Sequence, residues 1–120
     1  MRGLENLTKL QLDNNIIVKI QNLDNLVNLQ WLDLSFNLIT EIEGLDRCWQ
    51  LTDLSLYKNK IKNLGGLDQL QKLNVLSVGS NELSNLEDAI DYLRKLKNNL
   101  QVLRIDNNKF QKSRNAEYKK

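Results

Sequence analysis

The sequence predicts an α/β solenoid, with a curved parallel sheet on the concave side and short 3₁₀ or helical segments on the convex side. The first observation is a frame of eleven residues, L-x-x-L-x-L-x-x-N-x-I, which runs from Leu29 to Ile39. The second is its recurrence at intervals of 22, 22, 22 and 27 residues, with further copies that begin at Leu7, Leu51, Leu73 and Leu100. Self-similarity at a period of this length is typical of solenoids.

The frame is the signature of a leucine-rich repeat, so residues 1–120 are expected to form one domain of about five repeats. Each copy should begin with a short strand, and neighbouring strands should pair in parallel. Because strand side chains alternate between two faces, the Leu-x-Leu pair of each copy points inward. These inward pairs are Leu10/Leu12, Leu32/Leu34, Leu54/Leu56, Leu76/Val78 and Leu103/Ile105.

An asparagine follows each strand, at the point where the chain bends. Its side chain can bond the amide and carbonyl groups of the bend, which would cost roughly 1–3 kcal/mol each if they were buried without partners. The five are Asn15, Asn37, Asn59, Asn81 and Asn108. We therefore interpret these residues as structural.

After each asparagine the apolar residues follow in steps of three, a spacing that favours a 3₁₀ turn or a very short helix. Just before the third apolar position stand residues that tolerate a positive φ, which favours a tight turn; they are Asn22, Gly44 and Gly66. Cys48 shares an apolar column with Leu26 and Leu70 and is interpreted as a small buried residue. Without a histidine or a cationic cluster around it, Cys48 is a poor nucleophile.

The fourth repeat is five residues longer than the others, and residues 84–97 read as an amphipathic helix. Its apolar face is predicted to hold Leu86, Ile90, Leu93 and either Leu96 or the aliphatic stem of Lys97. Acidic residues stand near the start of the helix and basic residues near its end, an order that is favourable with the helix dipole. Residues 111–120 lose the apolar spacing and read as the start of an incomplete C-terminal cap. Because a solenoid end needs a polar cap, we expect the 120 residues to be part of a longer chain.

The composition argues against several classes of function. The formal net charge is only +2, and no apolar run approaches the roughly 20 residues that span a bilayer, so neither nucleic acid nor a membrane is expected as a partner. A single cysteine cannot form an internal disulfide, which favours a reducing compartment. The chain has no histidine and so lacks the commonest general base and metal ligand. We therefore expect that the protein is not an enzyme and that it binds no cofactor, metal ion or small-molecule substrate.

The outward residues of the strands are the positions that the fold leaves free, and this concave face is the usual binding surface of a solenoid. Trp31 and Tyr57 should project from adjacent strands with Phe36 close by at the rim, and exposed aromatic residues are favoured anchors in protein interfaces. The alternative is that Trp31 lies flat on its neighbours and Phe36 caps the edge of the core. The candidate protein-binding residues are Trp31, Tyr57, Phe36, Asp33, Asp53, Lys9, Val75 and Arg104.

The mixed charges of this face suit a protein partner better than nucleic acid. Asp33 and Asp53 are expected near each other across one strand pair, as paired carboxylates are in acid–base catalysis, but no oxyanion donor accompanies them. Gly65-Gly66 lacks the Lys-Ser/Thr of a phosphate-binding loop. The basic tail that begins at Lys109 has two interpretations, contact with an acidic surface such as tubulin or a solvated terminus.

Several runs of the sequence resemble a known group of proteins. The 22-residue spacing is similar to the intracellular class typified by the leucine-rich-repeat regulatory subunit of protein phosphatase 1. Within this class the chain resembles the dynein regulatory complex subunit 3 family, in KLQLDNNII at 9–17, WLDLSFN at 31–37, IEGLD at 42–46, DLSL at 53–56 and YLR at 92–94. The outward residues Gln11, Asp13, Trp31 and Asp33 are the most telling, because the fold does not require them.

This resemblance implies a non-catalytic scaffold subunit of the nexin–dynein regulatory complex, in the cytoskeleton of the ciliary or flagellar axoneme, that helps to regulate dynein-driven motility. It implies axonemal coiled-coil subunits, dynein or tubulin as partners, and coiled-coil helices after the repeat domain. The chain departs from the family where Asn-Pro usually follows the last strand, since Asn108-Lys109 stands there. The alternative function is a leucine-rich-repeat regulatory subunit of a protein phosphatase or another axonemal dynein-associated adaptor.

Overall fold

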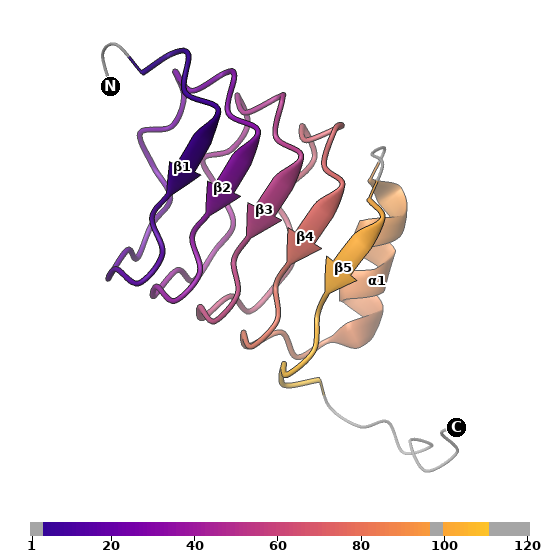
Figure 1. Ribbon diagram of the computed structural model, residues 1–120. Helices are drawn as coiled ribbons and strands as arrows, with labels where there is room; N and C mark the ends of the chain where they lie inside the picture. Colours follow the sequence, from indigo (N-terminus) through magenta and orange to yellow (C-terminus); the bar gives the residue numbers. More distant parts are fainter. Residues whose placement is uncertain (1–3, 97–99, 111–120) are drawn as a thin grey trace.

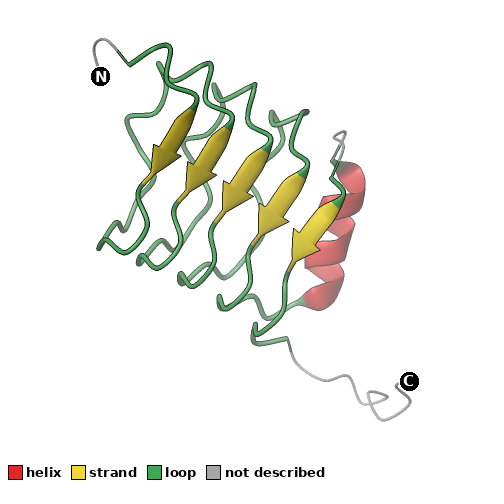
Figure 2. Cartoon of the chain, in the orientation of Figure 1, coloured by secondary structure: helices red, strands yellow, loops and turns green. Residues whose placement is uncertain are grey.

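The computed structural model describes residues 4–96 and 100–110, which form a solenoid with a parallel sheet on one side and loops and a helix behind it (Figure 1 and Figure 2). One sheet contains all five strands in the order β1-β2-β3-β4-β5. In chain order the elements are β1 (Lys9–Gln11), β2 (Trp31–Asp33), β3 (Asp53–Ser55), β4 (Val75–Ser77), α1 (Leu86–Lys95) and β5 (Val102–Arg104). This arrangement confirms the predicted leucine-rich-repeat solenoid.

The register of the sheet follows the repeat. Trp31 pairs with Asp53 and Asp53 with Val75, each 22 residues further on. Val75 then pairs with Val102 in the same register although 27 residues separate them. The five extra residues of the fourth repeat therefore stay out of the sheet and contribute to the segment that contains α1, behind the sheet in Figure 1.

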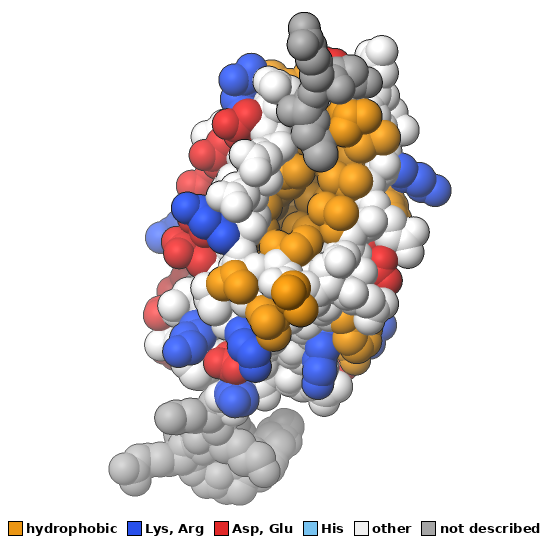
Figure 3. All heavy atoms as spheres, turned by 90° about the vertical axis from the view of Figure 1, so that its left-hand side faces the viewer, with side chains coloured by type: hydrophobic (Ala, Val, Ile, Leu, Met, Phe, Trp, Pro, Cys, Tyr) orange, Lys and Arg blue, Asp and Glu red, His pale blue; other side chains and the backbone are white. Residues whose placement is uncertain are grey.

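The core lies between the sheet and the convex loops, and it is closed only in the middle repeats. The inward pairs of β2, β3 and β4 are at most 1 % exposed. Leu10 and Leu12 of the first repeat are only half-buried, and Leu103 of the last is 38 % exposed, because no further repeat stacks on either end within the described residues. Figure 3 shows the β1 end, where hydrophobic side chains line a hollow.

The asparagines form a ladder that links each repeat to the one before it. Asn59 Nδ2 donates to Leu34 O at 3.0 Å in the preceding repeat and to Leu56 O at 3.1 Å in its own, and its Oδ1 accepts from Ile39 N at 3.0 Å. The same pattern holds for Asn37, Asn81 and Asn108. The structural interpretation of these residues is confirmed. Among the described residues, Asn15 of the first repeat bonds only to carbonyls of its own repeat.

The convex loops contain single turns closed by i→i+3 hydrogen bonds, which is one of the two forms that the sequence predicts. Leu26 N donates to Leu23 O at 3.0 Å, and Leu29 N donates to Leu26 O at 3.2 Å. These turns follow one another without overlapping, so they form no continuous 3₁₀ helix within the loops that the structure describes. Asn22, Gly44 and Gly66 have φ values of 67°, 75° and 71°, which confirms the expected tight turns.

Helix α1 starts as its sequence predicts but turns a different face to the core. Asn85 caps it by accepting a hydrogen bond from Asp88 N at 3.0 Å. Leu86 and Ile90, predicted on the buried face, are 45 % and 37 % exposed, whereas Ala89 is buried. That prediction is wrong at these two positions because the helix meets the core through its small residue, together with Tyr92, Leu93 and Leu96. Residue 97 of the predicted helix and the predicted cap at 111–120 lie outside the described residues.

Tyr92 fastens α1 to the preceding repeat. Its hydroxyl accepts a hydrogen bond from Leu67 N at 2.8 Å and donates one to the Asp68 carboxylate. Burial and this carboxylate raise the pKa of Tyr92 well above its ordinary value. The helix is therefore held by polar contacts as well as by apolar packing.

Candidate protein-binding face

The outward side chains of the strands form rows across the concave face, because every strand pairs in register with the next. The first row holds Lys9, Trp31, Asp53, Val75 and Val102. The second row holds Gln11, Asp33, Ser55, Ser77 and Arg104. These two rows contain six of the eight residues predicted to bind a protein, and Tyr57 and Phe36 lie beyond the strand ends.

Trp31 lies between a cation and a carboxylate in the first row. Lys9 Nζ is 5.5 Å from the centroid of the Trp31 ring, within the roughly 6 Å over which an ammonium group is attracted to an aromatic face. On the other side, Asp53 is the register partner of Trp31. The Thr52 hydroxyl donates to the Asp53 carboxylate at 2.8 Å. The half-buried Trp31 ring thus has a cation over it from β1, and a carboxylate stands at its register position in β3.

The structure separates the three aromatic residues into two groups. The rings of Phe36 and Tyr57 are in contact edge to face, with centroids 5.6 Å apart and planes at 63°. Tyr57 lies four residues beyond Asp53, the register partner of Trp31. At about 3.3 Å per residue this is about 13 Å along the strand direction. Trp31 therefore belongs to the strand face, whereas Phe36 and Tyr57 belong to the edge where the strands end.

Gly79 leaves the space that the Tyr57 ring needs. A Cβ atom at Gly79 would lie 3.2 Å from Tyr57 Cδ1 and 3.1 Å from Asp106 Oδ1. A larger residue would press on the ring from the next repeat. Gly79 was not among the residues singled out from the sequence, although it occupies the same column as Tyr57 one repeat later.

Phe36 occupies a position at which the backbone favours asparagine. Its φ is 57°, in the left-handed region. The residues at the same position of the other repeats also have positive φ, and they are Asn14, Lys58, Ser80 and Asn107. A left-handed conformation costs an ordinary residue about 1–2 kcal/mol, and asparagine tolerates it best after glycine. The chain therefore holds a ring that is 47 % exposed on an unfavourable backbone.

Asp33 and Asp53 do not face each other. Asp33 pairs in register with Ser55, and Asp53 with Trp31, so the two carboxylates are diagonal neighbours. Asp33 Oδ1 accepts hydrogen bonds from Ser35 N at 3.0 Å and Ser35 Oγ at 2.5 Å. Each carboxylate has its own local hydrogen-bond partner, and the two stand on paired strands without being direct register partners.

Arg104 lies at the exposed end of the second row, in β5. Its Nε is 3.5 Å from Asp106 Oδ1, and the two side chains are 61 % and 52 % exposed. An ion pair exposed to this degree contributes about 0–1 kcal/mol and exchanges readily. Arg104 is therefore free to contact a partner.

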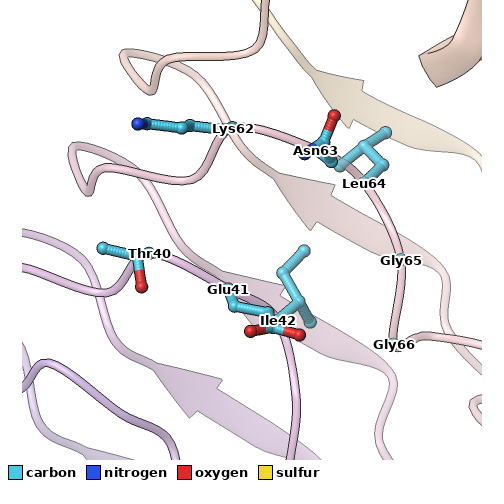
Figure 4. Close-up of a pocket in the computed structure, with 8 residues that line it drawn as sticks. All are labelled: Thr40, Glu41, Ile42, Lys62, Asn63, Leu64, Gly65 and Gly66. Carbon is cyan, nitrogen blue, oxygen red and sulfur yellow. The ribbon is translucent and has the colours of Figure 1, made fainter.

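A cavity of about 350 Å³ lies behind the sheet, between the loops of the second and third repeats (Figure 4). It is lined by residues 40–42 and 62–66, and Gly65 and Gly66 leave one wall without side chains. The polar groups of the lining are the Thr40 hydroxyl, the Glu41 carboxylate and the Lys62 ammonium group. Among the described residues, the Thr40 hydroxyl forms no hydrogen bond with a basic group.

Within residues 4–96 and 100–110, no group of three or more His, Cys, Asp or Glu side chains is arranged to hold a metal ion. No helix in the same ranges has the length and apolar character needed to cross a membrane.

Comparisons with known proteins match the repeats. Residues 27–69 match the family model of leucine rich repeats (2 copies). The functional domain of InlJ from Listeria monocytogenes, which includes a cysteine ladder, superimposes with a TM-score of 0.68 at 24 % identity over 93 % of this chain. The internalin InlF from Listeria monocytogenes superimposes with a TM-score of 0.69 at 30 % identity over 88 % of this chain. The chain spans 23 % and 36 % of the lengths of these two structures. No curated protein matches it.

Proposed function

We propose that this leucine-rich-repeat solenoid is a non-catalytic scaffold that binds another protein on its concave face. The observation that carries the proposal is the placement of Trp31, half-buried on the outward side of β2 between Lys9 and Asp53. The fold does not need an aromatic residue in this row, since charged and aliphatic residues pair there equally well in the other repeats. Tryptophan is enriched among the residues that dominate the free energy of protein association.

The surroundings of Trp31 support a protein as the bound species. Lys9 and Arg104 stand in the same two rows as Asp33 and Asp53, so both charge signs lie around an aromatic and aliphatic centre. Complementary mixed charges fix the orientation of a protein partner more than they raise its affinity. The match to leucine-rich repeats and the fold shared with the internalin InlF also support an interaction scaffold.

The finer proposal concerns where this scaffold acts. We propose a subunit of the nexin–dynein regulatory complex in the ciliary or flagellar axoneme, with coiled-coil subunits, dynein or tubulin as partners. This assignment is supported by the residue types at four outward positions, Gln11, Asp13, Trp31 and Asp33. None of the four is fully buried, so the core does not account for their identity.

The test is recovery of extracted axonemal proteins on the immobilised chain, with a matched pair of tryptophan variants. Trp49 is the control, because it is 45 % exposed in the loop before β3 and has Arg47 5.1 Å above its ring. We expect Trp31→Ala to reduce recovery of axonemal coiled-coil subunits about tenfold or more, and Trp49→Ala to leave it unchanged.

Two outcomes would contradict the proposal. Equal recovery by Trp31→Ala, with an unchanged circular dichroism spectrum, would remove the concave face as the binding surface. Recovery of a phosphatase catalytic subunit in place of axonemal proteins would contradict the axonemal assignment and favour the regulatory-subunit alternative.

A further inference from the structure

A second surface follows the edge of the sheet at which the strands end. Two hollows lie there, of about 390 Å³ and 500 Å³, and both are lined by Asn37, Leu38 and Lys58. Because they share these residues, the two hollows adjoin each other, and we call them together the strand-end groove. It passes along all five repeats, from Ile16 in the first to Lys109 in the fifth.

One end of the strand-end groove is apolar. Ile16, Phe36 and Leu38 line it and are 81 %, 47 % and 40 % exposed. The fold does not require these side chains, because Ile17 and Ile39 are the residues that face the core in these two turns. Large apolar residues exposed together are characteristic of interaction sites.

The other end of the strand-end groove is basic. The column that holds Ile16 and Leu38 continues as Lys60, Glu82 and Lys109 in the later repeats, and Lys58 takes the place of Phe36. The three lysines and one glutamate leave a charge of +2 in this half. None of these lysines forms an ion pair with a carboxylate of the described residues. An acidic ligand would therefore be attracted to this end.

We propose that the strand-end groove binds an extended acidic peptide segment of a partner protein. Large apolar side chains of the peptide sit against Ile16, Phe36 and Leu38, and its carboxylates contact Lys58, Lys60 and Lys109. Five strands at about 4.8 Å spacing extend over about 19 Å, which matches about six residues of extended peptide. Nucleic acid fits less well, because it would leave Glu82 and the apolar end without complementary groups.

This proposal is independent of the concave-face scaffold, because Trp31 does not line the strand-end groove. The two can therefore be tested separately. The probe is a phage-displayed library of random peptides, selected on the immobilised 120-residue chain. Enriched sequences are then synthesised with a fluorescent label, and their affinity is measured by fluorescence anisotropy.

We expect the enriched peptides to combine aromatic or aliphatic residues at one end with Asp or Glu at the other. Leu38→Ser and Lys60→Glu should each weaken binding about tenfold, and added salt should weaken it further. Lys62→Glu, which reverses an exposed lysine outside the groove, should leave the affinity unchanged, as should Trp31→Ala. Because Leu38 and Lys60 are exposed, these variants should keep the melting temperature of the parent chain, and Ile16→Ser repeats the test at a third site.

The proposal is overturned if no peptide is enriched, if the enriched peptides lack acidic residues, or if Leu38→Ser, Ile16→Ser and Lys60→Glu bind like the parent chain. Displacement of the peptide by a single-stranded oligonucleotide at equal concentration would overturn it in favour of nucleic acid. Loss of peptide binding in Trp31→Ala alone would overturn the strand-end groove as the binding site and would support the concave face instead.

Discussion

The rings of Phe36 and Tyr57 contact each other edge to face at a centroid distance of 5.6 Å, although the backbone of Phe36 is held at a φ of 57°. The left-handed backbone costs about 1–2 kcal/mol at such a residue. An aromatic pair in this geometry stabilises the folded chain by about 0.5–1.5 kcal/mol. The two effects nearly cancel, so stability does not explain why a phenylalanine stands at this position.

The first prediction tests this balance. Phe36→Asn should change the free energy of unfolding by less than about 1 kcal/mol, because relief of the backbone offsets the lost ring contact. Lys58→Asn should raise it by about 0.5–1 kcal/mol, since Lys58 has a φ of 61° and is exposed. Urea unfolding measures both values. A loss of more than about 2 kcal/mol in Phe36→Asn would show that this ring is part of the core.

The second prediction concerns the asparagine ladder. Asn59→Ala should lower the free energy of unfolding by about 3 kcal/mol or more, because it leaves buried backbone groups of two repeats without partners. Asn15→Ala should lower it by about 1 kcal/mol, because Asn15 is exposed and, in the part of the chain that the structure describes, bonds only within its own repeat. Thermal unfolding followed by circular dichroism compares them. Equal losses would contradict the role of the inter-repeat hydrogen bonds.

The third prediction uses two adjacent glycines. Gly66 has a φ of 71°, and a Cβ atom there would overlap the carbonyl oxygen of Ile42, whereas a Cβ atom at Gly65 has nothing within 4 Å. Gly66→Ala should destabilise the chain by more than about 1 kcal/mol, whereas Gly65→Ala should be neutral or stabilise it by about 0.4–1 kcal/mol. Chemical unfolding curves decide between them, and a tolerated Gly66→Ala would mean that the turn can rearrange.

The fourth prediction concerns pH. Burial, with smaller contributions from Asp24 and Asp46, raises the pKa of Cys48 from 9.0 to about 11. The fold therefore favours the neutral thiol, and this stabilisation is complete below pH 9 and is lost as the pH rises toward about 11. The free energy of unfolding should fall more steeply over this interval in the parent chain than in Cys48→Val, which keeps the column apolar. Parallel pH curves for the two proteins would contradict a buried titrating thiol.

The sequence predicted the inward residues well because the fold leaves them few choices. Leu32 and Leu34 must face the core once the strand alternates, and Asn37 must close the bend. The same alternation identified Trp31 and Asp33 as outward residues. Trp31 and Tyr57 come from adjacent repeats, but about four residues, or about 13 Å, separate their rows along the strand direction.

The buried face of α1 and the backbone conformation at the strand edge depend on tertiary contacts, which the periodicity of the sequence does not reveal. An apolar stripe that includes Leu86 and Ile90 satisfies the helical spacing, but the surface on which α1 packs selects the face with Ala89. Asn14 and Asn107 in the same column indicate the strained backbone of Phe36, since asparagine is common at positions with positive φ. The repeat pattern assigns no role to Trp49, because this residue stands between two repeat frames.

The pairing of Val75 with Val102 across the longest repeat has a practical meaning. Insertions behind the sheet change the length of the chain but leave the spacing of the outward residues as it was. Segments near α1 are therefore suitable places to graft a fluorescent label or an affinity handle. A ligand that spans several strands would meet the same arrangement of side chains before and after such a modification.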